Sequence, residues 1–166
     1  DMIMKEEVIV RADETGGSLF EHLSRVGARV CVKTMEAIEA GTAEYTPQDE
    51  SQATHTAKIH KELGSIDWTK DAKTIECLIR GLDPWPSAYT RLGDKTLKIW
   101  KATVLSENSN MAPGCIVKVE KNRILVQTGS GILALTEVQL EGKKRMPVDA
   151  FLNGYPVEEG TYFKRG

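Results

Sequence analysis

The sequence has little cysteine and no long hydrophobic run, and these two shortages exclude several classes of protein. Its three cysteines, Cys31, Cys77 and Cys115, are widely spaced and include no Cys-x-x-Cys pair. This pattern fits neither a disulfide framework nor a zinc site, so we interpret all three as small buried thiols. No run approaches the roughly 20 apolar residues that span a bilayer, and residues 1–6 lack the basic-then-apolar order of a secretory signal. We therefore expect an intracellular, cytoplasmic protein.

Motifs for nucleotide, metal or acid–base chemistry are also absent. No Gly-x-Gly-x-x-Gly or phosphate loop occurs, and Gly129-Ser130-Gly131 fits a hairpin turn better. No cluster has the spacing of metal ligands. His22 falls in a predicted helix and His55 and His60 fall in a polar linker, and none has a neighbouring Asn/Asp pattern that would orient a catalytic base. We expect no catalytic residue, cofactor or metal site in this sequence.

The composition is typical of a folded, soluble chain, but charge is distributed unevenly along the sequence. The net charge is −2, with 28% charged and 40% hydrophobic residues. Residues 1–70 carry 8 Lys and Arg against 13 Asp and Glu, whereas residues 71–166 carry 14 against 11. Attraction for a polyanion therefore belongs to the second part, and the small excess predicts modest, salt-sensitive binding.

The first 50 residues predict one strand and one helix. Residues 2–10 alternate loosely and are rich in Ile and Val, which is typical of a strand. Residues 18–21, Ser-Leu-Phe-Glu, have the form of a capping box, and the following helix is expected to end at Gly41. The apolar positions expected on one face of this helix are Leu19, Leu23, Val26, Val30 and Ile38. One strand and one helix cannot bury their apolar faces alone, so this segment is expected to self-associate.

The rest of the chain predicts a polar linker, a helix and a small barrel. Residues 42–64 have no steady apolar period, and Thr69 is expected to cap a helix that runs to about Leu82. Ala72, Ile75, Leu78 and Ile79 would form the buried side of that helix. Strands are expected over residues 88–92, 96–105, 115–119, 123–128 and 132–140, followed by a helix over 147–152. Tight turns suggest that the five strands close into a barrel, because closure removes exposed edges.

Six short segments, in this order, resemble the C-terminal portion of methionyl-tRNA formyltransferases. They are Gln48-Asp49-Glu50-Ser51, Ile66-Asp67-Trp68, Pro84-Trp85-Pro86, Lys98-Ile99-Trp100-Lys101-Ala102, Ala112-Pro113-Gly114 and Gly142-Lys143-Lys144-Arg145-Met146. The resemblance implies a mainly β fold with α-helices, in which residues 67–166 form an OB-like tRNA-binding domain of five strands. Residues 1–50 would be the remnant of a Rossmann-like catalytic domain and 51–66 the linker.

The resemblance also implies the reaction of the parent enzyme. The family transfers a formyl group from 10-formyltetrahydrofolate to the amine of methionyl initiator tRNA. Asp1-Met2 resembles the last two residues of the family's Gly-Leu-Asp-Thr-Gly-Asp-Met run, in which the catalytic aspartate is the earlier one. The family's catalytic Asn, His and Asp would therefore lie upstream of Asp1. We expect this fragment to be inactive by itself.

The residues expected to contact tRNA are Lys58, Lys61, Lys98, Lys101, Lys143, Lys144 and Arg145. The first two match the family's lysine-bearing linker segment and could reach phosphates without reading sequence. Lys98 and Lys101 are three apart on a predicted strand, so they should point to opposite faces. Lys143, Lys144 and Arg145 follow the last predicted strand at the barrel rim, with Arg145 ranked below the two lysines because relatives vary there.

The three tryptophans are interpreted as structural. Trp68 and Trp100 would be packing anchors, and Pro84-Trp85-Pro86 would form a rigid corner. Two other functions fit the same residues. One is a free-standing OB-like RNA-binding module, and the other is a formyltransferase relative that acts on a different amine, such as a nucleotide sugar, or in folate-linked hydrolysis.

Overall fold

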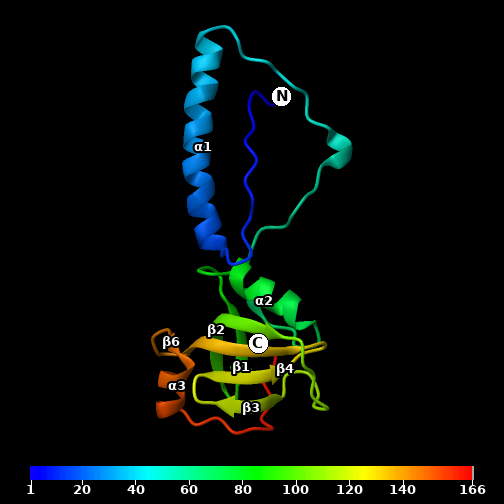
Figure 1. Ribbon diagram of the computed structural model, residues 1–166, viewed down its shortest axis with the longest axis vertical. Helices are drawn as coiled ribbons and strands as arrows, with labels where there is room; N and C mark the ends of the chain where they lie inside the picture. Colours follow the sequence, from blue (N-terminus) through cyan, green and yellow to red (C-terminus); the bar gives the residue numbers. More distant parts are fainter. Residues whose placement is uncertain (166) are drawn as a thin grey trace. The chain divides into compact units, whose positions relative to one another are not determined.

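The computed structural model describes residues 1–165, which form two compact units, Asp1–Lys58 and a second from Ile59 onward (Figure 1). The first unit is built around one long helix, α1 (Gly16–Glu39). Its N-cap is Thr15, whose hydroxyl accepts from the Ser18 backbone N at 3.1 Å, while the Ser18 hydroxyl accepts from the Thr15 N at 3.0 Å. The predicted capping box at Ser18 is therefore wrong by three residues. Gly41, with φ of +70°, follows the helix end as expected.

The predicted strand over residues 2–10 does not form. Only Met2 pairs there, in an isolated bridge with Thr46, because residues 1–58 contain no neighbouring strand with which to form a ladder. A single helix also leaves its apolar side largely uncovered. Of the five apolar positions expected on its face, only Val26 is buried, whereas Ile38 is 47% exposed.

The second unit begins with the 3₁₀ helix η2 (Lys61–Gly64) and helix α2 (Ala72–Gly81), after the 3₁₀ helix η1 (Glu50–Gln52) of the first unit. Asp71, not Thr69, caps α2, because its carboxylate accepts from the Thr74 backbone N at 2.8 Å. Thr69 instead donates its hydroxyl to Asp67 at 2.6 Å. The buried side of α2 is as predicted, with Ala72, Ile75 and Ile79 buried and Leu78 half-buried.

An open, antiparallel sheet of six strands carries the core of this unit. The strands are β1 (Ala88–Leu92), β2 (Lys95–Leu105), β3 (Ile116–Glu120), β4 (Arg123–Gln127), β5 (Ile132–Leu140) and β6 (Met146–Pro147). Their order is β1-β2-β5-β4-β3, with β6 paired to β5 and followed by α3 (Val148–Gly154). All five predicted strands are confirmed to within one residue at each end, whereas the two-residue β6 was not predicted. Figure 1 shows α2 over one side of the sheet and α3 beside β6.

The C-terminal segment hydrogen-bonds to both edges of the sheet. Arg91 of β1 and Lys164 exchange two backbone hydrogen bonds, at 3.0 and 3.1 Å. Ile116 of β3 donates to the Thr161 carbonyl at 2.8 Å. No ladder joins β1 directly to β3 in residues 1–165, so the expected closed barrel of five strands stays a prediction.

The tryptophans and cysteines differ in their surroundings. Trp68 is a core anchor as predicted: it is 5% exposed, donates from Nε1 to the Thr90 hydroxyl at 3.0 Å and stacks on Phe163. Cys115 is buried, but Cys31 and Cys77 lie exposed on helices, so the interpretation as buried thiols is wrong for these two.

Among residues 1–165, no helix is long and apolar enough to cross a membrane.

Candidate nucleic-acid interface

A bulge in β2 places two consecutive side chains, Trp100 and Lys101, on the outer side of the sheet. Ile99 pairs with Val138, but Lys101 pairs with Glu137, so Trp100 is an extra residue on its strand. Ile99 is buried and Ala102 packs against the core, whereas Lys98 is half-exposed and Lys101 is exposed. The prediction that Lys98 and Lys101 point to opposite faces is therefore wrong, because the bulge breaks the strict alternation of the strand.

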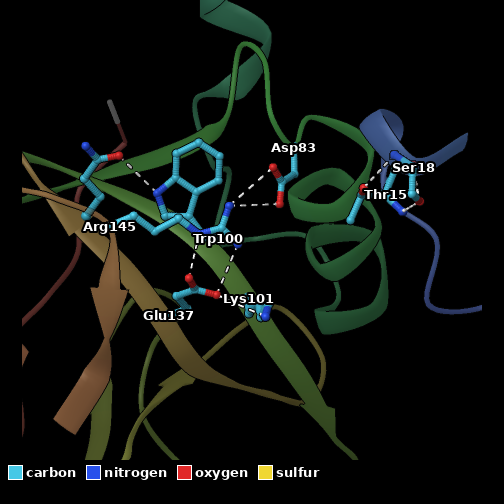
Figure 2. A network of polar contacts seen from close by, with 8 residues as sticks. Thr15, Ser18, Asp83, Trp100, Lys101, Glu137 and Arg145 are labelled. Carbon is cyan, nitrogen blue, oxygen red and sulfur yellow. Dashed lines mark hydrogen bonds and ion pairs between the residues drawn. The ribbon is translucent and has the colours of Figure 1, made fainter. Parts of the chain in front are cut away.

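Trp100 lies at the centre of a group of cations on this outer side (Figure 2). The Arg145 guanidinium carbon lies 4.5 Å from the centroid of the indole, and the Lys98 ammonium lies 5.8 Å from it. The indole Nε1 donates to the Gln139 side-chain oxygen at 3.2 Å. Trp100, interpreted as a packing anchor, is half-exposed and packs against positive side chains through cation–π contact instead of entering the core.

Two carboxylates offset the charge of Arg145. Its Nε and Nη2 donate to the two oxygens of Glu137 at 2.6 and 3.1 Å, and its Nη1 lies 3.3 Å from an oxygen of Asp83. Lys101 adds a second cation to Glu137, with Nζ 3.3 Å from Oε2. The hydrogen bond from Arg145, followed by that from Lys101, holds the pKa of Glu137 below its usual range. Arg145 is thus paired with two carboxylates, and the exposed Lys101 side chain pairs with one of them.

The turn between β5 and β6 presents two further lysines. Lys143 and Lys144 are exposed, and the turn is fixed because the Gln139 amide donates to the Lys143 carbonyl at 2.9 Å. Gly142 adopts φ of +75°, a conformation that favours glycine. A hollow of about 320 Å³ lies beside the turn. It is lined by Thr96, Lys98, Gln139, Leu140, Glu141 and Gly142.

The two linker lysines belong to different units. Lys58 ends the first unit, whereas Lys61 begins η2 in the second, and both side chains are exposed. The structure therefore groups Lys98, Lys101 and Arg145 around Trp100, with Lys143 and Lys144 in the turn that leads to Arg145.

Sequence reasoning missed the side chains that organise this group. Glu137 and Asp83 could not be identified as partners of Arg145, because their proximity depends on the register of β5 and on how α2 ends. Gln139, which bridges Trp100 to the turn, gave no signal either. The one usable signal was the alternation of β2, in which a tryptophan follows buried Ile99 and so falls on the outer face.

The histidines and acidic groups form no metal cluster in the described chain. His60 Nδ1 lies 2.9 Å from Glu62, and His22 Nδ1 lies 3.7 Å from Glu14. No group of three or more His, Cys, Asp or Glu residues within 1–165 could hold a metal ion.

Curated relatives match nearly the whole chain, and a family model matches its second part. Residues 58–156 match the family model described as formyl transferase, C-terminal domain. The chain is 60% identical over 163 residues to the methionyl-tRNA formyltransferase of Agathobacter rectalis, covering 98% of this chain and 53% of that protein. It is 47% identical over 166 residues to the methionyl-tRNA formyltransferase of Lachnospira eligens, covering 97% and 53%. The chain thus spans about half the length of these curated relatives.

Solved structures of HypX from Aquifex aeolicus share the fold. One variant superposes with a TM-score of 0.61 at 19% identity, covering 95% of this chain and 31% of HypX. HypX in complex with tetrahydrofolic acid gives a TM-score of 0.55 at 21% identity, covering 83% and 26%. Identities this low support a common fold and nothing finer.

Proposed function

The chain belongs to the formyl transferase C-terminal domain family, and from this premise we propose that it is the tRNA-binding portion of a methionyl-tRNA formyltransferase. The observation that carries the proposal is the 60% identity to the Agathobacter rectalis enzyme along 98% of this chain. The parent protein would transfer a formyl group from 10-formyltetrahydrofolate to the amine of methionyl initiator tRNA in the cytoplasm. This chain would hold the tRNA and orient its acceptor end, and by itself would be inactive.

The charges on the outer side of the sheet support contact with phosphates. Lys143 and Lys144 are exposed in a fixed turn, and Lys98 lines the adjacent hollow. Lysines in such positions can neutralise a phosphate backbone without reading the base sequence. Lys58 and Lys61, both exposed, would contact phosphates in the same way. Lys101 and Arg145 would contribute less, because Glu137 already pairs with both.

The domain organisation of the proposed portion has three parts. Residues 1–50 would be the end of the catalytic domain, 51–66 the linker and 67–166 an OB-like domain. In the OB-like domain, the C-terminal segment would complete the barrel of five strands. Its hydrogen bonds with Arg91 and Ile116, at the two edges of the open sheet, support this arrangement.

A second copy of the chain is proposed to pair with the first unit. Helix α1 exposes Phe20 by 76% and Met35 by 66%, and a shallow groove near its end is lined by Val32, Met35 and Ile38. Apolar side chains exposed in this number favour association. Light scattering at high concentration should show a dimer or larger species, and Phe20→Glu with Met35→Glu should return it to a monomer. A monodisperse wild-type monomer would exclude the pairing.

Binding of initiator tRNA tests the main proposal. We expect the folded chain to bind tRNA at low ionic strength and to release it as salt rises, because phosphate contacts release counterions. The absence of binding at low ionic strength, or an affinity independent of salt, would contradict it. Formylation of charged initiator tRNA by the complete enzyme tests the substrate assignment.

A further inference from the structure

Trp85 is the most exposed tryptophan of the chain, and no core packing accounts for it. Its side chain is 57% exposed, although the surrounding segment, Pro84-Trp85-Pro86, was interpreted as a purely structural corner. The two prolines fix the backbone φ angles on both sides of the tryptophan. The indole is therefore held out into solvent on a restricted backbone, so little conformational entropy would be lost when a ligand contacts it.

The turn that carries Trp85 contacts Arg145, one of the cations grouped around Trp100. Asp83, two residues earlier, lies 3.3 Å from Nη1 of Arg145. Arg145 directly follows Lys143 and Lys144, the exposed lysines of the β5–β6 turn. The β5–β6 turn is thus linked to the turn that presents the indole through the Asp83–Arg145 ion pair.

The same turn is also tied to η2, which begins at Lys61. Gly64 of η2 packs so closely on Ser87 that a Cβ at position 64 would lie 2.1 Å from the Ser87 carbonyl oxygen. Just after η2, the Ile66 backbone N donates to the Tyr89 carbonyl at 2.9 Å and adds a second contact between the same two segments. The turn thus joins the element that carries Lys61 to the element that carries Lys143 and Lys144.

We propose that Trp85 stacks on an unpaired base of the bound RNA, between the phosphate contacts of Lys61 and those of Lys143 and Lys144. The inference rests on the proposed function and adds to it a contact with a base. An exposed aromatic ring on a turn that contacts lysine-bearing elements suits a nucleic acid, because every base offers a π-face while lysines neutralise the flanking phosphates. An apolar protein partner would instead have to desolvate these charges.

Two variants of the full chain separate stacking from charge. Trp85→Leu removes the aromatic face and Trp85→Phe keeps one, and thermal unfolding checks that both fold. Binding to initiator tRNA and to a blunt-ended, fully paired RNA duplex is measured by fluorescence anisotropy over a range of salt. We expect Trp85→Leu to weaken tRNA binding about tenfold and Trp85→Phe by less than about threefold. The salt slope should stay unchanged, because stacking releases no counterions.

The outcomes distinguish the inference from the function on which it rests. If wild-type chain binds tRNA and Trp85→Leu binds it equally well, the stacking contact is excluded while the proposed function stands. An equal loss for tRNA and for the blunt-ended duplex would also overturn the inference, because the duplex offers no unpaired base. If the wild-type chain binds neither RNA, both fail. If the chain self-associates and Trp85→Leu abolishes this association, the indole belongs to a protein interface.

Discussion

Arg145 stacks over Trp100 while it forms a bidentate ion pair with Glu137. The guanidinium carbon lies 4.5 Å from the indole centroid, and the two hydrogen bonds to the carboxylate measure 2.6 and 3.1 Å. This geometry requires a planar group that can stack on a ring and donate two parallel hydrogen bonds in the same position. Trp100 lies on the outer side because it follows buried Ile99, and the bulge in β2 brings Lys101 to the same side.

Replacement of Arg145 by Lys should destabilise the second unit. Lysine keeps the charge but loses the paired hydrogen bonds and the planar stack, so we expect the free energy of unfolding to fall by about 1–2 kcal/mol. Urea denaturation measures the change. Lys144→Met, an exposed cation of the preceding turn, is the matched control and should stay within about 0.5 kcal/mol of wild type. Equal stability of Arg145→Lys and wild type would show that the stacked pair is not stabilising.

The contribution of Glu137 to stability should disappear in acid. Arg145 lowers the pKa of Glu137 in the folded protein, so the unfolded chain binds this proton more readily. The stabilisation is therefore present above the ordinary carboxyl pKa of about 4.3 and is lost as pH falls through the lower pKa of the folded state. Urea unfolding of wild type and Glu137→Gln should differ at pH 7 and converge toward pH 3. A difference that does not vary with pH would refute this linkage.

The exposed and the paired lysines should contribute differently to RNA binding. Lys143→Met and Lys144→Met should each lower the slope of log K against log salt by about one, as expected for the loss of one phosphate contact. Lys101→Met should change it less, because Glu137 lies 3.3 Å from the Lys101 ammonium. Titrations of tRNA at several salt concentrations compare them. A larger change of this slope for Lys101→Met than for Lys143→Met would contradict the proposal that the exposed lysines make the stronger phosphate contacts.

Gly64 should tolerate no side chain. A Cβ there would lie 2.1 Å from a backbone oxygen of Ser87, so Gly64→Ala must displace η2 or the turn and should cost about 1–3 kcal/mol. Gly81→Ala is the control: it ends α2 with nothing within 4 Å of the added Cβ and should be neutral or slightly stabilising. Thermal unfolding of the two variants tests the contact. Similar stability of Gly64→Ala and Gly81→Ala would mean that η2 and the turn are not in close contact.

The sequence was most informative where local chemistry decides structure. Turn residues such as Gly93 located the strands of the sheet to within one residue, and the buried side of α2 followed from its apolar period. The N-caps of α1 and α2 were predicted at the wrong residues because neighbouring side chains compete for the free backbone amides of the first turn. Thr15 and Asp71 each lie three residues before such an amide and accept its hydrogen bond. The strand expected over residues 2–10 failed because a strand needs a neighbour that residues 1–58 do not supply.

The sequence proposes the residues of the candidate site by type, but it does not indicate how they are arranged. Lys61 was expected in the linker but lies in the second unit, and strict alternation placed Lys98 and Lys101 on opposite faces. The bulge at Trp100 arises from the register of β2 against β5, which a single sequence does not encode locally. The acidic partners of Arg145 depend on the same long-range packing.

Charge reversal tests the central claim most directly, which is that cations on this scaffold hold a tRNA. The variant Lys58→Glu, Lys143→Glu, Lys144→Glu should fold normally, because all three side chains are exposed. At low salt, anisotropy should show at least a tenfold loss of affinity for initiator tRNA relative to the wild-type chain. An affinity equal to that of the wild-type chain would contradict the account.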